Sequence, residues 1–455
     1  MSEEPTAAPQ PPPEPAPAPP PEPAPLLTLR DGLPPVVETV EALEAAASAI
    51  AAGTGPVAID AERASGYRYS ARAYLVQLRR EGAGTCLVDP VPLPQLTPLA
   101  AALEGTEWIL HAASQDLACL AEVGLRPARL FDTELAGRLL GYPRVGLATM
   151  VEELLGRRMR KEHSAVDWST RPLPSSWLEY AALDVEVLVE LRDELHRQLV
   201  DAGKLEWALE DFEHLRTAPS ALPRAEPWRR TSGLHRVRGR RSLAAVRALW
   251  QARDAIASQR DVTPSRIIPD SAVVEAAVAM PRDRGALLGL KGFVGRGAQR
   301  YAATWLDALR QAVALSDAEL PQLAARQDGP PPPRTWNDKD PAAAARLAAA
   351  RAALTARAEE LSLPVENLLS PDAVRRVMWE PPEPADVEGV AAALRTLGAR
   401  AWQVQLVAPL LSEAVRAGEH GAVGEHDAVG EHGAVGEQGA ADGAPADPPV
   451  TDSLD

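Results

Sequence analysis

Hydrophobic and polar positions alternate differently along successive parts of the chain. Between Leu27 and about Arg216, short apolar and β-branched runs at 57–60, 73–79, 85–89 and 107–111 predict strands. Apolar residues spaced three and four apart then predict helices over 115–123, 132–141, 147–155 and 176–200. A strand-rich half followed by helices is typical of a mixed sheet covered by helices, so we predict an α/β domain over 27–216.

From residue 242 the periodicity is helical only. Breaks at Pro264, Pro269 and Pro281 predict a compact bundle to about residue 315, and a further helical stretch covers 340–416. Both stretches contain a helix, a short break and an apolar pair before the next helix, which suggests a diverged repeat. A basic segment over 217–241 and a Pro-rich segment over 316–339 are predicted to be linkers.

The two ends of the chain have little to bury. Residues 1–26 consist mainly of Pro, Ala and Glu, and a Gly-Glu-His hexapeptide recurs in the segment 417–455. The repeat offers His420, His426 and His432 as metal ligands, but a flexible acidic tail is the simpler interpretation. We therefore predict that both ends are disordered.

Composition narrows the class of protein. At 455 residues and 46% hydrophobic content the chain is expected to form two or three globular domains. Cys86 and Cys119 are the only cysteines and lack metal-ligand spacing, so we expect reduced thiols. No apolar run is long enough to span a membrane and no signal peptide is evident, so we expect a cytoplasmic protein, with a monomer favoured.

Charge is distributed unevenly. The net charge is −16, yet residues 224–310 contain 17 Lys and Arg against 7 Asp and Glu. A local basic surplus of this kind is typical of a phosphate-binding surface. The alternative is a solvated basic linker.

Four carboxylates form the most informative chemical pattern. Asp60 and Glu62 end an apolar run and share one face of a strand, Asp116 follows the strand that ends near His111, and Asp184 lies one helical turn after Tyr180. No Lys or Arg lies within the three motifs, 57–62, 111–117 and 180–184. Divalent cations are therefore the expected counter-charge, and two of them would support phosphoryl transfer.

A Gly-rich turn in the first bundle is a weaker signal. The segment 289–297 resembles the turn of a helix-hairpin-helix, in which backbone amides approach a phosphate, and it includes Arg296. A tight packing turn without a ligand is an equally good interpretation.

The order of these motifs resembles the DEDD family of 3′-to-5′ exonucleases, in its tyrosine subclass, and most closely ribonuclease D. The segment from Lys161 through Asp167, Trp168 and Arg171 is similar to the family's stretch before the third motif. Residues 242–315 resemble the HRDC domain, and 340–416 resemble a second, weaker copy.

The resemblance implies a ribonuclease H-like exonuclease domain with a mixed sheet and flanking helices, followed by one or two all-α HRDC-type bundles. It implies two divalent ions, Mg²⁺ or Mn²⁺, held by Asp60, Glu62, Asp116 and Asp184, with Tyr180 orienting the attacking water. The expected partner is RNA with a single-stranded 3′ end, tRNA precursors among them. The candidate substrate-binding residues are Gln77, His111, Gln115, Lys161 and Arg296.

Two other functions use the same pattern. A DNA 3′-to-5′ exonuclease would need the same carboxylates, because discrimination depends on contacts to the 2′-hydroxyl that no motif reveals. A non-catalytic nucleic-acid-binding protein on a nuclease scaffold is disfavoured, since all four acids and the tyrosine are present.

Overall fold

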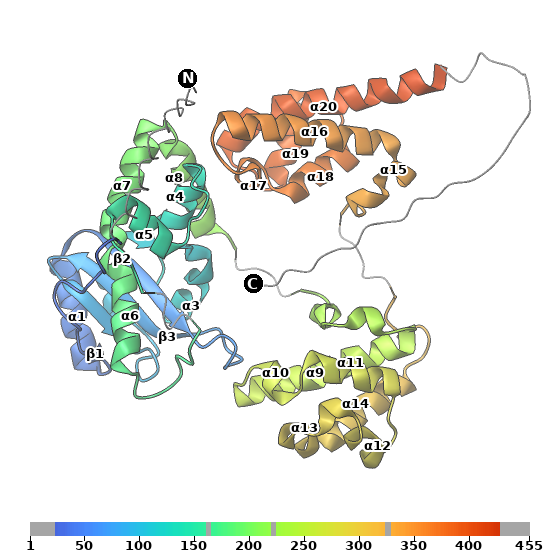
Figure 1. Cartoon of the computed structure of the whole chain (residues 1–455), viewed down its shortest axis with the longest axis horizontal. Helices are drawn as coiled ribbons and strands as arrows, with labels where there is room; N and C mark the ends of the chain where they lie inside the picture. The colour runs from blue at the N-terminus through green and yellow to red at the C-terminus, as the bar shows by residue number, and fades with distance from the viewer. Residues whose placement is uncertain (1–22, 161–164, 220–223, 324–328, 428–455) are drawn as a thin grey trace, which may run out of the picture.

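The computed structural model describes residues 23–160, 165–219, 224–323 and 329–427. The predicted disorder of 1–22 and 428–455, including most of the hexapeptide repeat, lies outside these residues. Three bodies follow one another along the chain: an α/β domain and two helical units (Figure 1).

A six-stranded mixed sheet forms the centre of the first domain, in the order β1-β4-β3-β2-β5-β6. The strands are β1 (Val36–Val37), β2 (Thr54–Arg63), β3 (Ala73–Glu81), β4 (Gly84–Val88), β5 (Glu107–Leu110) and β6 (Arg129–Asp132). β3 pairs antiparallel with β2 and β4, whereas β5 runs parallel to both β2 and β6. The four predicted strands are confirmed, and the mixed sheet with flanking helices is the predicted fold.

Helices cover both faces of this sheet. One face packs against α1 (Val40–Ala52), α2 (Thr97–Ala102) and α3 (Leu117–Glu122), and the other against α4 (Thr133–Leu139), α5 (Leu147–Leu155), α6 (Ser175–Glu186), α7 (Leu188–Asp201) and α8 (Leu205–Thr217). The helix predicted over 176–200 is two helices, α6 and α7, which are separated at Val187 with φ −111° and ψ −6°. α1, which the sequence analysis missed, begins where the Thr39 hydroxyl accepts a hydrogen bond from the amide of Ala42.

The first helical unit contains α9 (Arg240–Arg260), α10 (Pro264–Ile267), α11 (Asp270–Ala279), α12 (Arg284–Leu288), α13 (Arg296–Arg300) and α14 (Ala302–Ala314). The segments predicted to be linkers on either side of it are partly packed. Trp228 is 3% exposed and Leu320 is 8% exposed, and both belong to the core of this unit. A linker assignment from Pro and Arg content overlooked these apolar anchors.

The second helical unit contains α15 (Trp336–Lys339), α16 (Pro341–Glu360), α17 (Val365–Leu368), α18 (Pro371–Trp379), α19 (Val387–Thr396) and α20 (Ala401–Asp427). It repeats the order of the first unit, since a long helix, a four-residue helix and a buried aliphatic pair precede the next helix in both. The pairs are Ile267-Ile268 and Leu368-Leu369. α20 also continues past residue 416, where the helical domain was predicted to end and the tail to follow.

The N-terminal boundary likewise differs from the prediction. Pro25 and Leu26 were assigned to the disordered end, yet Leu26 forms a parallel bridge with Arg158, and the Arg158 amide donates to the Pro25 carbonyl at 2.9 Å. Backbone pairing of this kind does not depend on side-chain hydrophobicity, which is why composition failed to indicate it.

Both helical units contact the α/β domain. In the first unit, Asp261 at the end of α9 accepts hydrogen bonds from the Ser70 amide at 2.8 Å and the Tyr74 hydroxyl at 3.3 Å. In the second, the rings of Trp402 and Trp207 stack with centroids 4.9 Å apart. No described helix combines the length and apolar character needed to cross a membrane.

Candidate active site

Three of the four predicted carboxylates meet between β2 and α6. Val57, Ala58 and Ile59 are buried in β2. Asp60 and Glu62 follow them and lie on the face of the strand that α6 covers. Asp184 belongs to the buried stretch of α6. Ligand oxygens of Asp60, Glu62 and Asp184 all lie within 4.8 Å of one another.

Asp116 is positioned by a turn at the end of β5. Ala112 adopts a left-handed conformation with φ 60°, and a 3₁₀ turn over Ala113–Gln115 leads into Asp116 and α3. Asp132, at the end of β6, holds this turn because its carboxylate accepts hydrogen bonds from the amides of Ala112 at 3.2 Å and Ala113 at 2.8 Å. The same carboxylate caps α4 through the amide of Glu134. Asp132 is a positioning residue that the sequence analysis did not identify.

Asp116 lies beside the group of three carboxylates but outside the 4.8 Å within which they converge, and it pairs with Arg63. The guanidinium Nη2 of Arg63 lies 3.4 Å from Asp116 Oδ1, and the Asp116 side chain is 6% exposed. Arg63 stands one residue after the first motif, so the absence of basic residues within the motifs gave an incomplete account of the local charge. Its Nε is buried without a hydrogen-bond partner among the described residues.

All four carboxyl groups have raised pKa values, first of all because they are buried. Burial raises the pKa of Glu62 to about 10, and the charges of Asp60, Asp184 and Asp116 add to this effect. Burial followed by the charge of Asp60 raises the pKa of Asp116 to about 8. Burial also raises the pKa of Asp60 and Asp184. The charge of Arg63 opposes this increase at Asp60, Glu62 and Asp116, and a bound cation would supply further positive charge.

The environment of Gln77 also fits a site that binds a cation. It lies opposite Asp60 in the β2–β3 register, and cross-strand partners project from the same face of a sheet. The side chain is 0% exposed, and neither amide atom has a hydrogen-bond partner among the described residues. A buried unpaired amide beside three converging carboxylates fits a hydrated cation with water ligands.

Tyr180 lies one turn before Asp184 and hydrogen bonds to its side chain. Burial, followed by the charge of Asp184, raises the pKa of the Tyr180 phenol. Both side chains line a cavity of about 40 Å³ together with Met159 and Arg160. Tyr180 therefore lies beside the cluster of three carboxylates and lines a cavity large enough for a water molecule.

The predicted substrate-binding residues have different environments. Gln77 is fully buried, so it cannot contact a substrate directly. His111 bonds through Nδ1 to the Thr133 hydroxyl at 2.9 Å, and burial lowers its pKa to about 4, which makes it a neutral strand-end histidine. Gln115 is exposed beside the Asp116 turn. Lys161 lies outside the described residues, and Arg296 is exposed on α13, in the first helical unit.

The Gly-rich turn that contains Arg296 is built for packing. The amides of Lys291 and Gly292, which could have met a phosphate, donate to the Glu275 carboxylate at 3.1 and 3.0 Å. A Cβ on Gly292 would lie 2.5 Å from the side chain of Ala272. Close approach to α11 therefore explains the glycine, and the packing interpretation of this turn is the better one.

Part of the basic surplus of residues 224–310 is also structural. Arg240 and Arg241 donate to backbone carbonyls in the last turn of α14 and after it, including Val313 at 3.0 Å and Leu320 at 2.8 Å. Arg253 is 5% exposed and pairs with Asp270 at 2.7 Å. The exposed basic side chains that remain include Arg266, Lys291, Arg296 and Arg300.

Comparison with known families gives the same division of the chain. Residues 34–200 match a model described as 3′-5′ exonuclease, and residues 242–309 match the HRDC domain. Residues 329–415 match a model described as 3′ to 5′ exonuclease C-terminal domain. The third match gives a specific description to the unit that the sequence analysis identified as a second HRDC-like copy.

Individual relatives cover most of the chain. Ribonuclease D of Acidiphilium cryptum is 33% identical over 310 residues, which span 66% of this chain and 77% of that protein. A crystal structure of a protein from Bifidobacterium adolescentis is 37% identical with a TM-score of 0.80, covering 87% of this chain and all of that one. Escherichia coli RNase D, described as an exoribonuclease involved in structured RNA processing, is 26% identical with a TM-score of 0.63, covering 84% of this chain and 98% of that one.

An α/β domain that carries a cluster of carboxylates on a mixed sheet, followed in the chain by an HRDC domain, defines a 3′-to-5′ exonuclease. The coverage and identity of the relatives then give the family. The chain belongs to the ribonuclease D family, and it is a hydrolytic 3′-to-5′ exoribonuclease.

Proposed function

We propose that the chain hydrolyses RNA from its 3′ end with two divalent cations, Mg²⁺ or Mn²⁺, and releases nucleoside 5′-monophosphates. The proposed ligands are Asp60, Glu62, Asp116 and Asp184. The convergence of Asp60, Glu62 and Asp184 within 4.8 Å carries this proposal, since three carboxylates so close together, one buried and two half-buried, repel one another without a cation. Asp116 is the fourth ligand by its place beside them.

The bound cations and Tyr180 would have different roles in the reaction. When bound, the cations would activate a water and stabilise the leaving 3′-oxygen. Tyr180 would orient the attacking water by hydrogen bonding, from its position one turn before Asp184. A bond from the water oxygen to phosphorus forms, the bond to the 3′-oxygen breaks, and a proton passes to that oxygen.

RNA with a single-stranded 3′ end is the proposed substrate, with tRNA precursors or other small structured RNAs as its natural form. The carboxylates lie between β2 and α6, and the exposed basic side chains of the HRDC domain would hold the body of the RNA while its 3′ end reaches them. The description of Escherichia coli RNase D as an enzyme of structured RNA processing supports this substrate class. The expected compartment stays the cytoplasm.

The decisive experiment follows 5′-labelled RNA and DNA oligonucleotides of one sequence in Mg²⁺, in Mn²⁺ and in chelator. We expect stepwise shortening of the RNA, dependence on the metal, and a loss of at least about a thousandfold in Asp60→Asn and Asp184→Asn. Glu153→Gln is the matched control, because Glu153 is exposed on α5 and has no ion pair with a described residue.

The alternatives predict other patterns. Equal shortening of DNA and RNA would replace the RNA-specific proposal by a general exonuclease. Tight binding without metal-dependent shortening would indicate a non-catalytic protein and contradict the proposed roles of the four acids.

A further inference from the structure

A second, larger hollow adjoins the catalytic cavity. Its volume is about 560 Å³, and its lining includes Leu26, Arg144, Glu152, Arg158, Met159 and Arg160. Met159 and Arg160 also line the small cavity that contains Tyr180 and Asp184. The two spaces are therefore neighbours that share a wall, and the larger one falls in the size range of small-molecule binding sites.

Three arginines give this hollow a positive charge. Arg144, Arg158 and Arg160 are exposed, and none is within ion-pair distance of a carboxylate belonging to the described residues. Other arginines of the α/β domain are paired, including Arg138 with Glu134 at 2.7 Å and Arg192 with Glu107 at 2.9 Å. Glu152 is the single acid on the wall, so a net charge of +2 faces the space.

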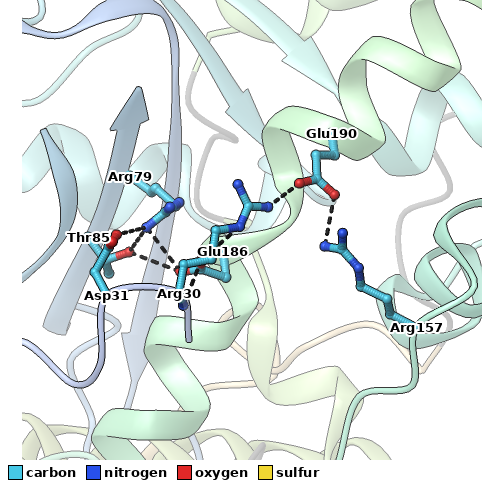
Figure 2. Close-up of polar contacts among 7 residues, drawn as sticks. All are labelled: Arg30, Asp31, Arg79, Thr85, Arg157, Glu186 and Glu190. Atoms are coloured by element: carbon cyan, nitrogen blue, oxygen red, sulfur yellow. Dashed lines mark hydrogen bonds and ion pairs between the residues drawn. The ribbon is translucent and has the colours of Figure 1, made fainter. Parts of the chain in front are cut away.

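The segment that carries Arg158 and Arg160 is held in place on both sides. The Leu27 amide donates to the Arg158 carbonyl at 2.9 Å, which ties this segment to the N-terminal strand. Arg157 pairs with Glu190 on α7 at 2.9 Å, and Glu190 also binds Arg30 (Figure 2). Because the backbone of this segment is held, only the side chains of Arg158 and Arg160 have to be ordered when they meet an anion.

We propose that this arginine hollow binds the phosphate groups of nucleotides next to the scissile bond. The inference rests on the proposed function. The planar guanidinium groups suit bidentate contacts with phosphate oxygens, and Leu26 and Met159 offer apolar surface to a sugar or base. The nucleotide could belong to the substrate strand or be the released 5′-monophosphate.

The test uses the double variant Arg144→Ala/Arg158→Ala in the full chain, with Arg126→Ala as control. Arg126 is exposed, follows α3, and has no hydrogen bond or ion pair with a described residue. Steady-state rates are measured on RNA oligomers of two to eight nucleotides at several salt concentrations. Inhibition by adenosine 5′-monophosphate is measured in parallel.

If the hollow holds the substrate strand, KM for the octamer rises about tenfold or more, because each charge-assisted hydrogen bond contributes about that factor. The kcat stays within about twofold, and the kinetics on the dinucleotide are unaffected. The slope of log KM against log salt concentration decreases by about 1.4, or about 0.7 per lost phosphate contact. If the hollow holds the product, the inhibition constant of the monophosphate rises instead. Unchanged values, or an equal loss in Arg126→Ala, overturn the proposal.

Direct binding separates this proposal from the proposed function. A fluorescent RNA octamer is titrated into Asp184→Asn with and without the two arginine substitutions, so that no hydrolysis is needed. A tenfold weaker affinity of the triple variant supports the hollow even where the unsubstituted protein fails to shorten RNA. Equal affinities contradict the proposed role of the hollow even if the unsubstituted protein is an active exoribonuclease.

Discussion

Replacing Arg63 by Gln should strengthen divalent-cation binding at the fourth carboxylate. The Arg63 guanidinium neutralises Asp116 at 3.4 Å, so a cation that uses Asp116 must compete with this internal positive charge. We therefore expect the free protein to bind one cation tightly through Asp60, Glu62 and Asp184, and a second cation weakly.

The separation of the charges sets the size of the effect. At 3.4 Å and an effective dielectric constant of about 20, the interaction amounts to about 5 kcal/mol before other terms. The Arg63 side chain is 27% exposed, and solvent screening reduces the net effect to about 1–2 kcal/mol. The second dissociation constant should fall by a factor of about 5–30 in the variant.

Calorimetric titration with Mn²⁺, without RNA, measures both dissociation constants in the unsubstituted protein, Arg63→Gln and Arg63→Lys. The lysine variant keeps the charge and should retain weak second binding. In chelator, Arg63→Gln should also melt at a lower temperature, since four carboxylates then lack their internal cation, and Mn²⁺ should reverse that loss. Weaker Mn²⁺ binding in Arg63→Gln, or a change of equal size in Arg126→Gln, would refute the reasoning.

Three further predictions concern residues that position the site. Asp132→Ala removes a carboxylate that holds the turn before Asp116, so it should lower kcat more than it raises KM and cost about 2–4 kcal/mol in denaturant unfolding. Lys204→Met removes an ammonium that donates to Leu139 O at 2.7 Å and Leu361 O at 2.6 Å, so limited proteolysis should release the C-terminal unit faster. Asp261→Ala weakens one contact between the HRDC domain and the α/β domain, so it should slow trimming of a structured RNA while leaving a dinucleotide unaffected. Equal loss on both RNAs would contradict this role of Asp261.

Local patterns were sufficient to predict four of the six strands and most helices that surround the site. The apolar runs of β2 to β5 and the spacing of Tyr180 and Asp184 are properties of consecutive residues, and period alone fixes which side chains share a face. The pairing of Arg63 with Asp116 joins the end of β2 to the start of α3, which are distant in the chain. An adjacent arginine could have been noted, but its direction depends on the turn that Asp132 holds.

Buried partners far apart in the sequence explain the weaker prediction of the domains. Helices α16 to α20 share one hydrophobic core with α4, α5, α7 and α8, and Gly141 lies so close to Ser362 that a Cβ there would be 2.3 Å from its carbonyl oxygen. The C-terminal unit is thus packed into the exonuclease domain, although the sequence presents it as a separate bundle after a Pro-rich segment (Figure 1). Removing everything after residue 219 would expose Trp207 and leave Asp211 without Arg400, so lost activity in such a truncation would report misfolding as much as lost RNA contacts. Point substitutions on the HRDC surface, at Lys291 or Arg296, isolate the contribution of RNA binding, because those side chains are exposed and have no side-chain hydrogen bond or ion pair with a described residue.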